Sequence, residues 1–332
     1  MKILYAIQGT GNGHISRAKD VYPILKQYGD VDVLISGIQA DVDVPFPVTY
    51  KRYGMSFIFG KKGGVDIIDT ARKLRVPQLV SDIRKLPVEQ YDLVINDFEP
   101  ITSWACRNKG LPCVSLSHQC AVLHPAAPRP SFVDPLGKLV LQHYAPVTAS
   151  YGFHFRSYGP NIYTPVIRRE VRQLTPTSNG HYTVYLPAYS DEALVQHLGR
   201  FADVRWHVFS KHNKAPFTTG NISVRPIDNK AFIESMAAAS GVLCGAGFEG
   251  PAEAMYLGKK LLVVPMQAQY EQQCNAVAAA DMGAAVVSKL GPDSYDTIRQ
   301  WLDTGKPIQV HYPDMTSQIV ADVVQRHGGR RN

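Results

Sequence analysis

Short apolar runs alternate with segments of helix-like apolar spacing along most of the chain. An apolar run bounded by turn residues predicts a buried strand, and apolar residues spaced three and four apart predict a helix. In the first half the pattern predicts a helix over 15–25 and strands over 3–7, 31–37, 49–53, 91–97 and 112–118. In the second half it predicts helices over 190–199 and 229–239 and strands over 182–186, 204–209, 222–225, 241–244 and 261–265.

This alternation predicts an α/β protein with parallel sheets and right-handed crossovers. The pattern starts afresh in the middle of the chain, and 332 residues are long for a single core. We therefore expect two Rossmann-like parallel-sheet domains facing a central cleft. The N-terminal domain is expected over 1–160, a linker over 161–180 and the C-terminal domain over 181–332.

The composition is that of an ordinary globular protein, with 45% hydrophobic and 19% charged residues. A formal charge of +7 favours anionic partners such as nucleotide phosphates or phospholipid headgroups, whereas no basic run with interleaved aromatics indicates nucleic acid. No apolar run reaches the roughly 18–20 residues that span a bilayer, and we expect no cleavable leader because the first predicted strand begins so near residue 1. The five cysteines lack paired spacing, which predicts reduced thiols, no zinc site and a cytoplasmic location.

The first glycine-rich segment, Gln8 to His14, stands between the first predicted strand and the first predicted helix. Such a turn lets the backbone approach a ligand closely, and the helix N-terminus attracts anions. A dinucleotide site is disfavoured because the glycines do not follow G-x-G-x-x-G and no acidic residue ends the second strand. We predict that His14 contacts the ligand or acts as the catalytic base, in the neutral form that its place near a helix N-terminus favours.

Ligands on parallel sheets collect at the carboxyl ends of the strands. Polar residues follow two of these ends and are candidates to line the cleft: Asp97, Glu99, His118 and Gln119. For His118 a structural hydrogen bond is as consistent with the pattern as a contact to the substrate. The D-x-D segments at 30–32 and 41–43 are expected to be a strand edge and a surface loop rather than a metal site.

A second glycine-rich segment, Cys244 to Glu253, follows the strand predicted over 241–244 and leads into a helix. Its glycines at 245, 247 and 250 predict another anion cradle. We expect Glu253 to reach a sugar hydroxyl beside a bound diphosphate, and Glu249 either to contact the ligand or to cap the helix. The glutamines after the next strand offer amide donors and acceptors: Gln267, Gln269, Gln272 and Gln273.

Taken together, the two glycine loops, the P-x-Q after the second and the Q-Q-x-N-A beyond it resemble the GT-B nucleotide-sugar glycosyltransferases. The closest resemblance is to family 28, which includes the lipid-linked N-acetylglucosaminyltransferase of peptidoglycan synthesis. The resemblance implies a GT-B architecture, in which the two domains face a central cleft and the last helix packs back on the N-terminal domain. The resemblance implies that the C-terminal domain binds a donor, usually a UDP-sugar, with Glu253 on the ribose. It further implies a diphosphate-binding turn at Gly245, Ala246, Gly247, Phe248, Glu249 and Gly250, donor-sugar contacts at Gln267, Gln272 and Gln273, and an acceptor-side loop at Gly11, Asn12, Gly13 and His14.

By this resemblance the expected reaction is an inverting, metal-independent transfer of a hexose or N-acetylhexosamine to a hydroxyl of a lipid-linked or other glycoconjugate acceptor, without a cofactor. Aromatic and basic residues over 55–62 and a basic helix predicted over 65–86 then match a patch that contacts the inner face of the cytoplasmic membrane. Two alternatives remain open: a nucleotide-sugar epimerase of the same fold, and a non-catalytic nucleotide-sugar-binding protein.

Overall fold

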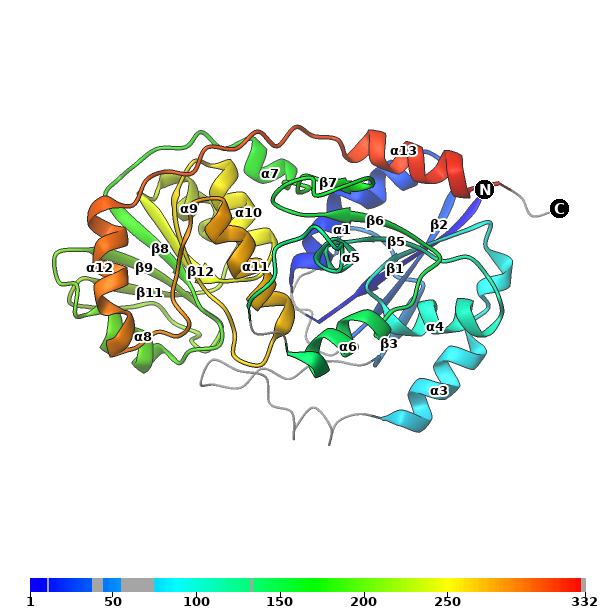
Figure 1. The fold of residues 1–332 in the computed structure, drawn as a ribbon, viewed down its shortest axis with the longest axis horizontal. Coiled ribbons are helices and arrows are strands. Elements are labelled where there is room, and N and C mark those ends of the chain that lie inside the picture. Colours follow the sequence, from blue (N-terminus) through cyan, green and yellow to red (C-terminus); the bar gives the residue numbers. More distant parts are fainter. Residues whose placement is uncertain (11, 38–43, 55–74, 132–133, 330–332) are drawn as a thin grey trace.

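The computed structural model describes residues 1–10, 12–37, 44–54, 75–131 and 134–329. Two seven-stranded sheets lie side by side, each covered by helices on both faces (Figure 1). The prediction of two parallel-sheet α/β domains is confirmed, although one edge pair of the second sheet is antiparallel. Gly11, the second D-x-D segment and the expected membrane segment up to residue 74 lie outside the described residues.

The first sheet has the strand order β3-β2-β1-β4-β5-β6-β7, and all its strand pairs are parallel. Its strands are β1 (Lys2–Gln8), β2 (Asp30–Ser36), β3 (Tyr50–Arg52), β4 (Leu93–Asp97), β5 (Val114–Ser117), β6 (Ala149–Phe153) and β7 (Ile162–Tyr163). Its described helices are α1 (Asn12–Leu25), α3 (Val76–Lys85), η1 (Val88–Gln90), α4 (Pro100–Asn108), α5 (His118–Val122), α6 (Pro135–His143) and α7 (Arg169–Arg172). The sheet therefore extends to Tyr163, just past residue 160.

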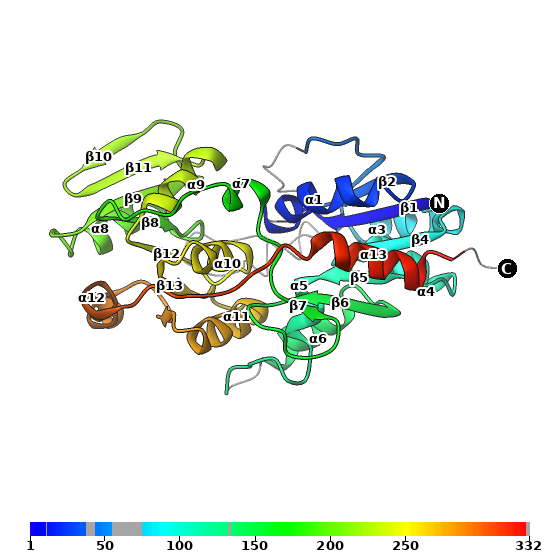
Figure 2. The same cartoon turned by 90° about the horizontal axis from the view of Figure 1, so that it is seen from above.

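The second sheet has the strand order β10-β11-β9-β8-β12-β13-β14. Its strands are β8 (His181–Tyr185), β9 (Arg205–Ser210), β10 (Phe217–Thr219), β11 (Ile222–Pro226), β12 (Gly241–Gly245), β13 (Lys260–Val264) and β14 (Ala285–Val286). The helices are α8 (Asp191–Leu198), α9 (Asn229–Ala238), α10 (Glu249–Tyr256), α11 (Tyr270–Asp281), η2 (Pro292–Ser294), α12 (Tyr295–Thr304) and α13 (Thr316–His327). The last of them, α13, returns to the first domain and packs beside α1 (Figure 2).

The hydrophobic pattern accounts for these elements. β1 is apolar on both faces because helices cover the sheet on both sides, and Ile3 to Ile7 are fully buried. In α1 the residues Ile15, Ala18, Val21 and Leu25 recur at helical spacing and are also 0% exposed. One apolar cluster continues from this core into the second domain through Phe155 and Phe248. The two domains are thus packed directly on each other.

Candidate functional site

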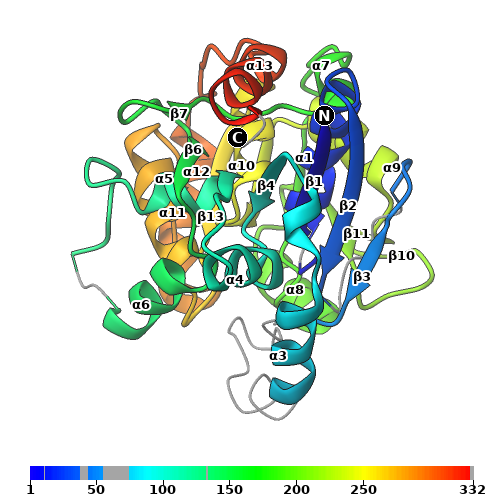
Figure 3. The same cartoon turned by 90° about the vertical axis from the view of Figure 1, so that its right-hand side faces the viewer.

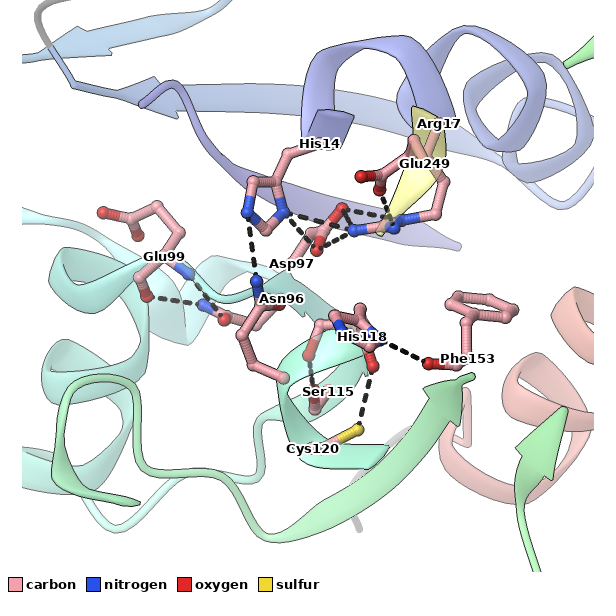
Figure 4. A network of polar contacts seen from close by, with 12 residues as sticks. His14, Arg17, Asn96, Asp97, Glu99, Ser115, His118, Cys120, Phe153 and Glu249 are labelled. Atoms are coloured by element: carbon pink, nitrogen blue, oxygen red, sulfur yellow. Dashed lines mark hydrogen bonds and ion pairs between the residues drawn. The ribbon is translucent and has the colours of Figure 1, made fainter. Parts of the chain in front are cut away.

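His14 lies in the first turn of α1, beyond the carboxyl end of β1 (Figure 4). Its Nδ1 is 2.8 Å from Oδ1 of Asp97, the last residue of the neighbouring strand β4. The imidazole is 13% exposed and the carboxylate fully buried. A carboxylate that accepts the Nδ1 proton fixes the tautomer and leaves the Nε2 lone pair to accept another proton. The pair therefore has the geometry of a histidine base oriented by an aspartate.

The charges around this pair shift the pKa of His14. Burial lowers the pKa of His14, but the Asp97 carboxylate and its hydrogen bond outweigh burial and raise that pKa above 6.5. Burial raises the pKa of Asp97, yet Arg17 and His14 together hold it below its usual value. The sequence pattern points to the helix N-terminus as the dominant influence on His14, but the adjacent carboxylate is stronger, and by raising the pKa it makes the imidazole a stronger proton acceptor.

Arg17 lies one helical turn beyond His14 and holds the Asp97 carboxylate of the pair. It donates to Asp97 from Nε at 3.1 Å and from Nη2 at 2.7 and 2.8 Å. From Nη1 it also donates to Oε1 of Glu249 at 2.6 Å, across the domain boundary. Arg17 is not among the predicted site residues. Its spacing of three residues from His14 could have indicated that it lies beside the base, because residues three apart share one helix face.

The other acceptor-side candidates divide into two groups. Gln119 is near the base: its Nε2 lies 3.4 Å from His14 Nε2 and 3.2 Å from Glu271 Oε2. Glu99 is instead the N-cap of α4 and accepts from the backbone N–H groups of Ile101 and Thr102 and from Ser36 Oγ at 2.6 Å. Glu99 is therefore a structural residue, since it is fully buried and both its oxygens are used.

His118 has a structural role between the domains. Its Nδ1 donates to the Phe153 carbonyl oxygen at 2.7 Å, and its Nε2 lies 2.8 Å from Asn275 Oδ1 in the second domain. Its ring also stacks on Phe248, with 3.8 Å between the ring centroids. Of the two roles predicted for His118, the structure favours the structural hydrogen bond. Asn275 was not recognised as its partner because 157 residues separate the two.

The second glycine loop joins β12 to α10. An added Cβ at Gly247 or Gly250 would meet no atom within 4 Å, so these two positions face open space. Ala246 and Phe248, by contrast, are 1% and 4% exposed and belong to the core between the domains. Of this loop, the glycines are therefore the part that a ligand can approach, and Phe248 is a packing residue.

The glutamines of the second domain differ in position. Gln272 lines a small pocket at the carboxyl ends of β8, β12 and β13, together with Pro187 and Gly245. Its Oε1 accepts from the Met266 backbone N–H at 2.9 Å. Gln267 is exposed and Gln273 is partly exposed. The pocket lies where ligands of parallel sheets collect.

Glu253 is not free to meet a ligand in this structure. It is 2% exposed, and its two oxygens accept from Arg168 Nε at 2.5 Å and Nη2 at 2.6 Å. Arg168 Nη1 also donates to Glu170 and Asn229. The predicted ribose contact would therefore have to share or displace a buried ion pair. Nothing in the sequence pairs Arg168 with a residue 85 positions away.

The remaining predictions concern metals, thiols and membranes. Among the described residues, no group of three or more His, Cys, Asp or Glu could hold a metal ion. Asp30 and Asp32 lie at the start of β2, away from the strand ends that form the cleft, and Asp32 accepts from Tyr91 and Thr49. All five cysteines are unpaired. No helix within the described ranges is long and apolar enough to cross a membrane.

Comparison with known proteins agrees with the geometry. The family model for glycosyl transferase family 1 matches residues 1–303. Among solved structures, MurG of Acinetobacter baumannii has 16% identity and a TM-score of 0.55, with 98% of this chain and 100% of that chain covered. UGT2 of Phytolacca americana, solved with UDP-2-fluoro-glucose and pterostilbene, has 13% identity, a TM-score of 0.60 and 98% coverage of both chains.

A third structure, the glycosyltransferase SsfS6 of Streptomyces sp. SF2575 with thymidine diphosphate, has 12% identity and a TM-score of 0.56, covering 97% of this chain and 99% of that chain. A search of curated proteins gave no match. At these identities the structural likeness shows the fold, which is the GT-B fold implied by the resemblance of the two glycine loops and the P-x-Q and Q-Q-x-N-A motifs.

Proposed function

Because this chain belongs to glycosyl transferase family 1, we propose that it moves a hexose or N-acetylhexosamine from a nucleotide sugar to an acceptor hydroxyl, with inversion at the anomeric carbon. The observation that carries the proposal is the contact of the two glycine loops. The His14–Asp97 pair of the first domain and the loop before α10 of the second are joined by Arg17 and Glu249. A proton acceptor thus stands beside a candidate phosphate cradle.

The proton step follows from the geometry of the pair. His14 Nε2 removes the proton of the acceptor hydroxyl as its oxygen bonds to the anomeric carbon and the bond to the nucleoside diphosphate breaks. Asp97 keeps the imidazole oriented and stabilises the imidazolium that forms. Gln119, 3.4 Å from Nε2, borders the position where the acceptor hydroxyl would stand.

The leaving diphosphate requires positive potential on the donor side. The backbone N–H groups at the start of α10 and the helix dipole provide it next to Gly247 and Gly250. The proposal involves no metal ion. UDP is our proposed nucleotide, since UGT2 was solved with a UDP-sugar; thymidine diphosphate in SsfS6 is the precedent for the alternative.

Gly247→Ala tests the donor loop. The added methyl group meets no protein atom, so the fold should be unchanged, whereas a diphosphate against the backbone would be displaced. We expect the affinity for UDP, measured by calorimetry, to fall on the order of tenfold, or about 1.4 kcal/mol. Gly291→Ala is the matched control, because its methyl group also meets no atom within 4 Å. Equal UDP affinities in the two variants would contradict the loop assignment.

We propose a lipid-linked acceptor presented at a membrane surface, with α3 as the part of the described chain that contacts it. None of the α3 residues is buried, and Val76 and Val80 are 50% and 39% exposed. Arg84 and Lys85 lie in its last turn, and Figure 3 shows the helix at the lower edge of the first domain. An amphipathic basic helix with exposed apolar side chains is suited to an anionic lipid surface.

Replacing both Val76 and Val80 by aspartate should weaken binding to anionic vesicles of phosphatidylglycerol and phosphatidylcholine on the order of tenfold in a sedimentation assay. The control is Phe217→Asp, which places a charge at an exposed apolar side chain of β10 in the other domain. Wild-type protein that stays in the supernatant, or a double variant that binds as well as wild type, would exclude this role of α3.

The proposed function itself is tested by a thermal-shift screen of UDP-, GDP- and dTDP-sugars, followed by turnover of the stabilising donor with an extract of membrane lipids. We expect one nucleotide class to raise the melting temperature, and nucleoside diphosphate to be released only when acceptor is present. If the donor binds but nucleoside diphosphate is not released with any acceptor, the result would instead support a nucleotide-sugar-binding protein.

A further inference from the structure

Arg17 is one of the largest fully buried side chains of the protein, at 2% exposure. Its guanidinium lies between two carboxylates from different domains, Asp97 on β4 and Glu249 on α10. Three of its contacts go to Asp97, and Nη1 alone reaches Glu249, at 2.6 Å. A buried guanidinium is stable only when its donors are paired, so both carboxylates contribute to holding this side chain in place.

Glu249 is itself held against the first domain. Its side chain is 24% exposed, and a Cβ built on Gly13 would collide with its carboxylate. The glycine at position 13 therefore leaves the space in which Glu249 reaches Arg17. This gives Gly13 a specific function in the first glycine loop: it admits a side chain of the opposite domain beside the base.

We propose that Arg17 is a positioning residue that couples the donor-side loop to the His14–Asp97 pair, so that the pair is fully assembled only while Glu249 holds the other edge of the guanidinium. This rests on the proposed function, in which the loop before α10 carries the donor. Occupation or movement of that loop would then be transmitted to the proton acceptor through one side chain.

The charges that face His14 make the coupling measurable. They come from three elements: Asp97 on β4, Arg17 on α1 and Glu249 on α10. The neighbouring α5 contributes the uncharged Gln119, behind which Glu271 of α11 lies. Asp97 and Glu249 raise the pKa of His14, whereas Arg17 lowers it. Loss of Arg17 and loss of Glu249 should therefore move the titration of His14 in opposite directions.

The test is the NMR titration of the His14 imidazole, which needs no substrate, in Arg17→Gln, Arg17→Lys and Glu249→Gln. We expect Glu249→Gln to lower its midpoint and Arg17→Gln to raise it, each by about half a pH unit or more. Arg17→Lys should stay nearer to the wild-type midpoint because it keeps the charge. Glu249→Gln keeps the size of a partly exposed side chain, so the experiment does not depend on Arg17→Gln being folded.

Glu234→Gln is the matched control, since Glu234 lies on α9 of the same domain with its side chain 52% exposed and should leave the titration unchanged. A His14 midpoint unaffected by Glu249→Gln, or shifted upward, would overturn the coupling. Failure of the proposed function gives a different result. In that case wild-type protein would release no nucleoside diphosphate with any acceptor, while the opposite shifts of the midpoint persist.

Discussion

Replacing His14 by alanine is expected to lower kcat for sugar transfer on the order of 10³-fold, because a positioned general base contributes roughly 10²–10⁴-fold. The protein should remain folded. Asp97 keeps its three contacts to Arg17 in this variant, so the substitution leaves no buried carboxylate unpaired. The measurement is kcat at saturating donor and acceptor, with circular dichroism to establish the fold.

His311→Ala is the matched control for this substitution, since His311 is exposed and lies in the segment between α12 and α13. It should have the kcat of the wild type. If His14→Ala also kept near-normal kcat, the acceptor hydroxyl would have to lose its proton to another group, and the function of the His14–Asp97 pair would be structural.

Replacing Glu253 by alanine is expected to lower the free energy of unfolding by about 3–5 kcal/mol. The reason is that removal of one partner leaves the other charge of a buried ion pair without compensation. Arg168 would lose the two contacts at 2.5 and 2.6 Å and would keep only those to Glu170 and Asn229. The measurement is urea unfolding of wild type and variant.

The control is Glu234→Ala, which removes an exposed carboxylate from the same domain and should change the free energy of unfolding by less than about 0.5 kcal/mol. A similarly small loss for Glu253→Ala would mean that Arg168 finds other partners or reaches water.

The ion pair also changes how ribose binding must be tested. A weaker UDP affinity of Glu253→Ala supports a direct contact between Glu253 and the ribose only if UDP binding is measured under conditions in which the variant is fully folded.

The local part of the site follows from the sequence. A strand, a glycine turn and a helix at β1–α1, repeated at β12–α10, could be recognised because apolar periodicity and glycine placement are properties of adjacent residues. Parallel pairing then brings the ends of β1 and β4 together, which is why His14 and Asp97 could be expected at one cleft. These predictions require only the order of the elements.

The partners across the domains could not be predicted in the same way. Arg17 and Glu249 are 232 residues apart, and Arg168 and Glu253 are 85 apart. No local pattern encodes which carboxylate a buried arginine meets, because that is decided by how the two sheets pack. Glu99 illustrates the opposite difficulty: it follows a strand end like a cleft residue, yet its carboxylate caps the next helix.

The most direct test of the account is to follow the anomeric proton of the sugar by NMR while the preferred nucleotide sugar is incubated with the protein, with and without the lipid acceptor. Without acceptor, we expect the donor signal to persist. With acceptor, it is replaced by the signal of a product of inverted configuration as nucleoside diphosphate appears. Conversion of the donor sugar in the absence of acceptor, as an epimerase would perform, or a product of retained configuration would contradict it.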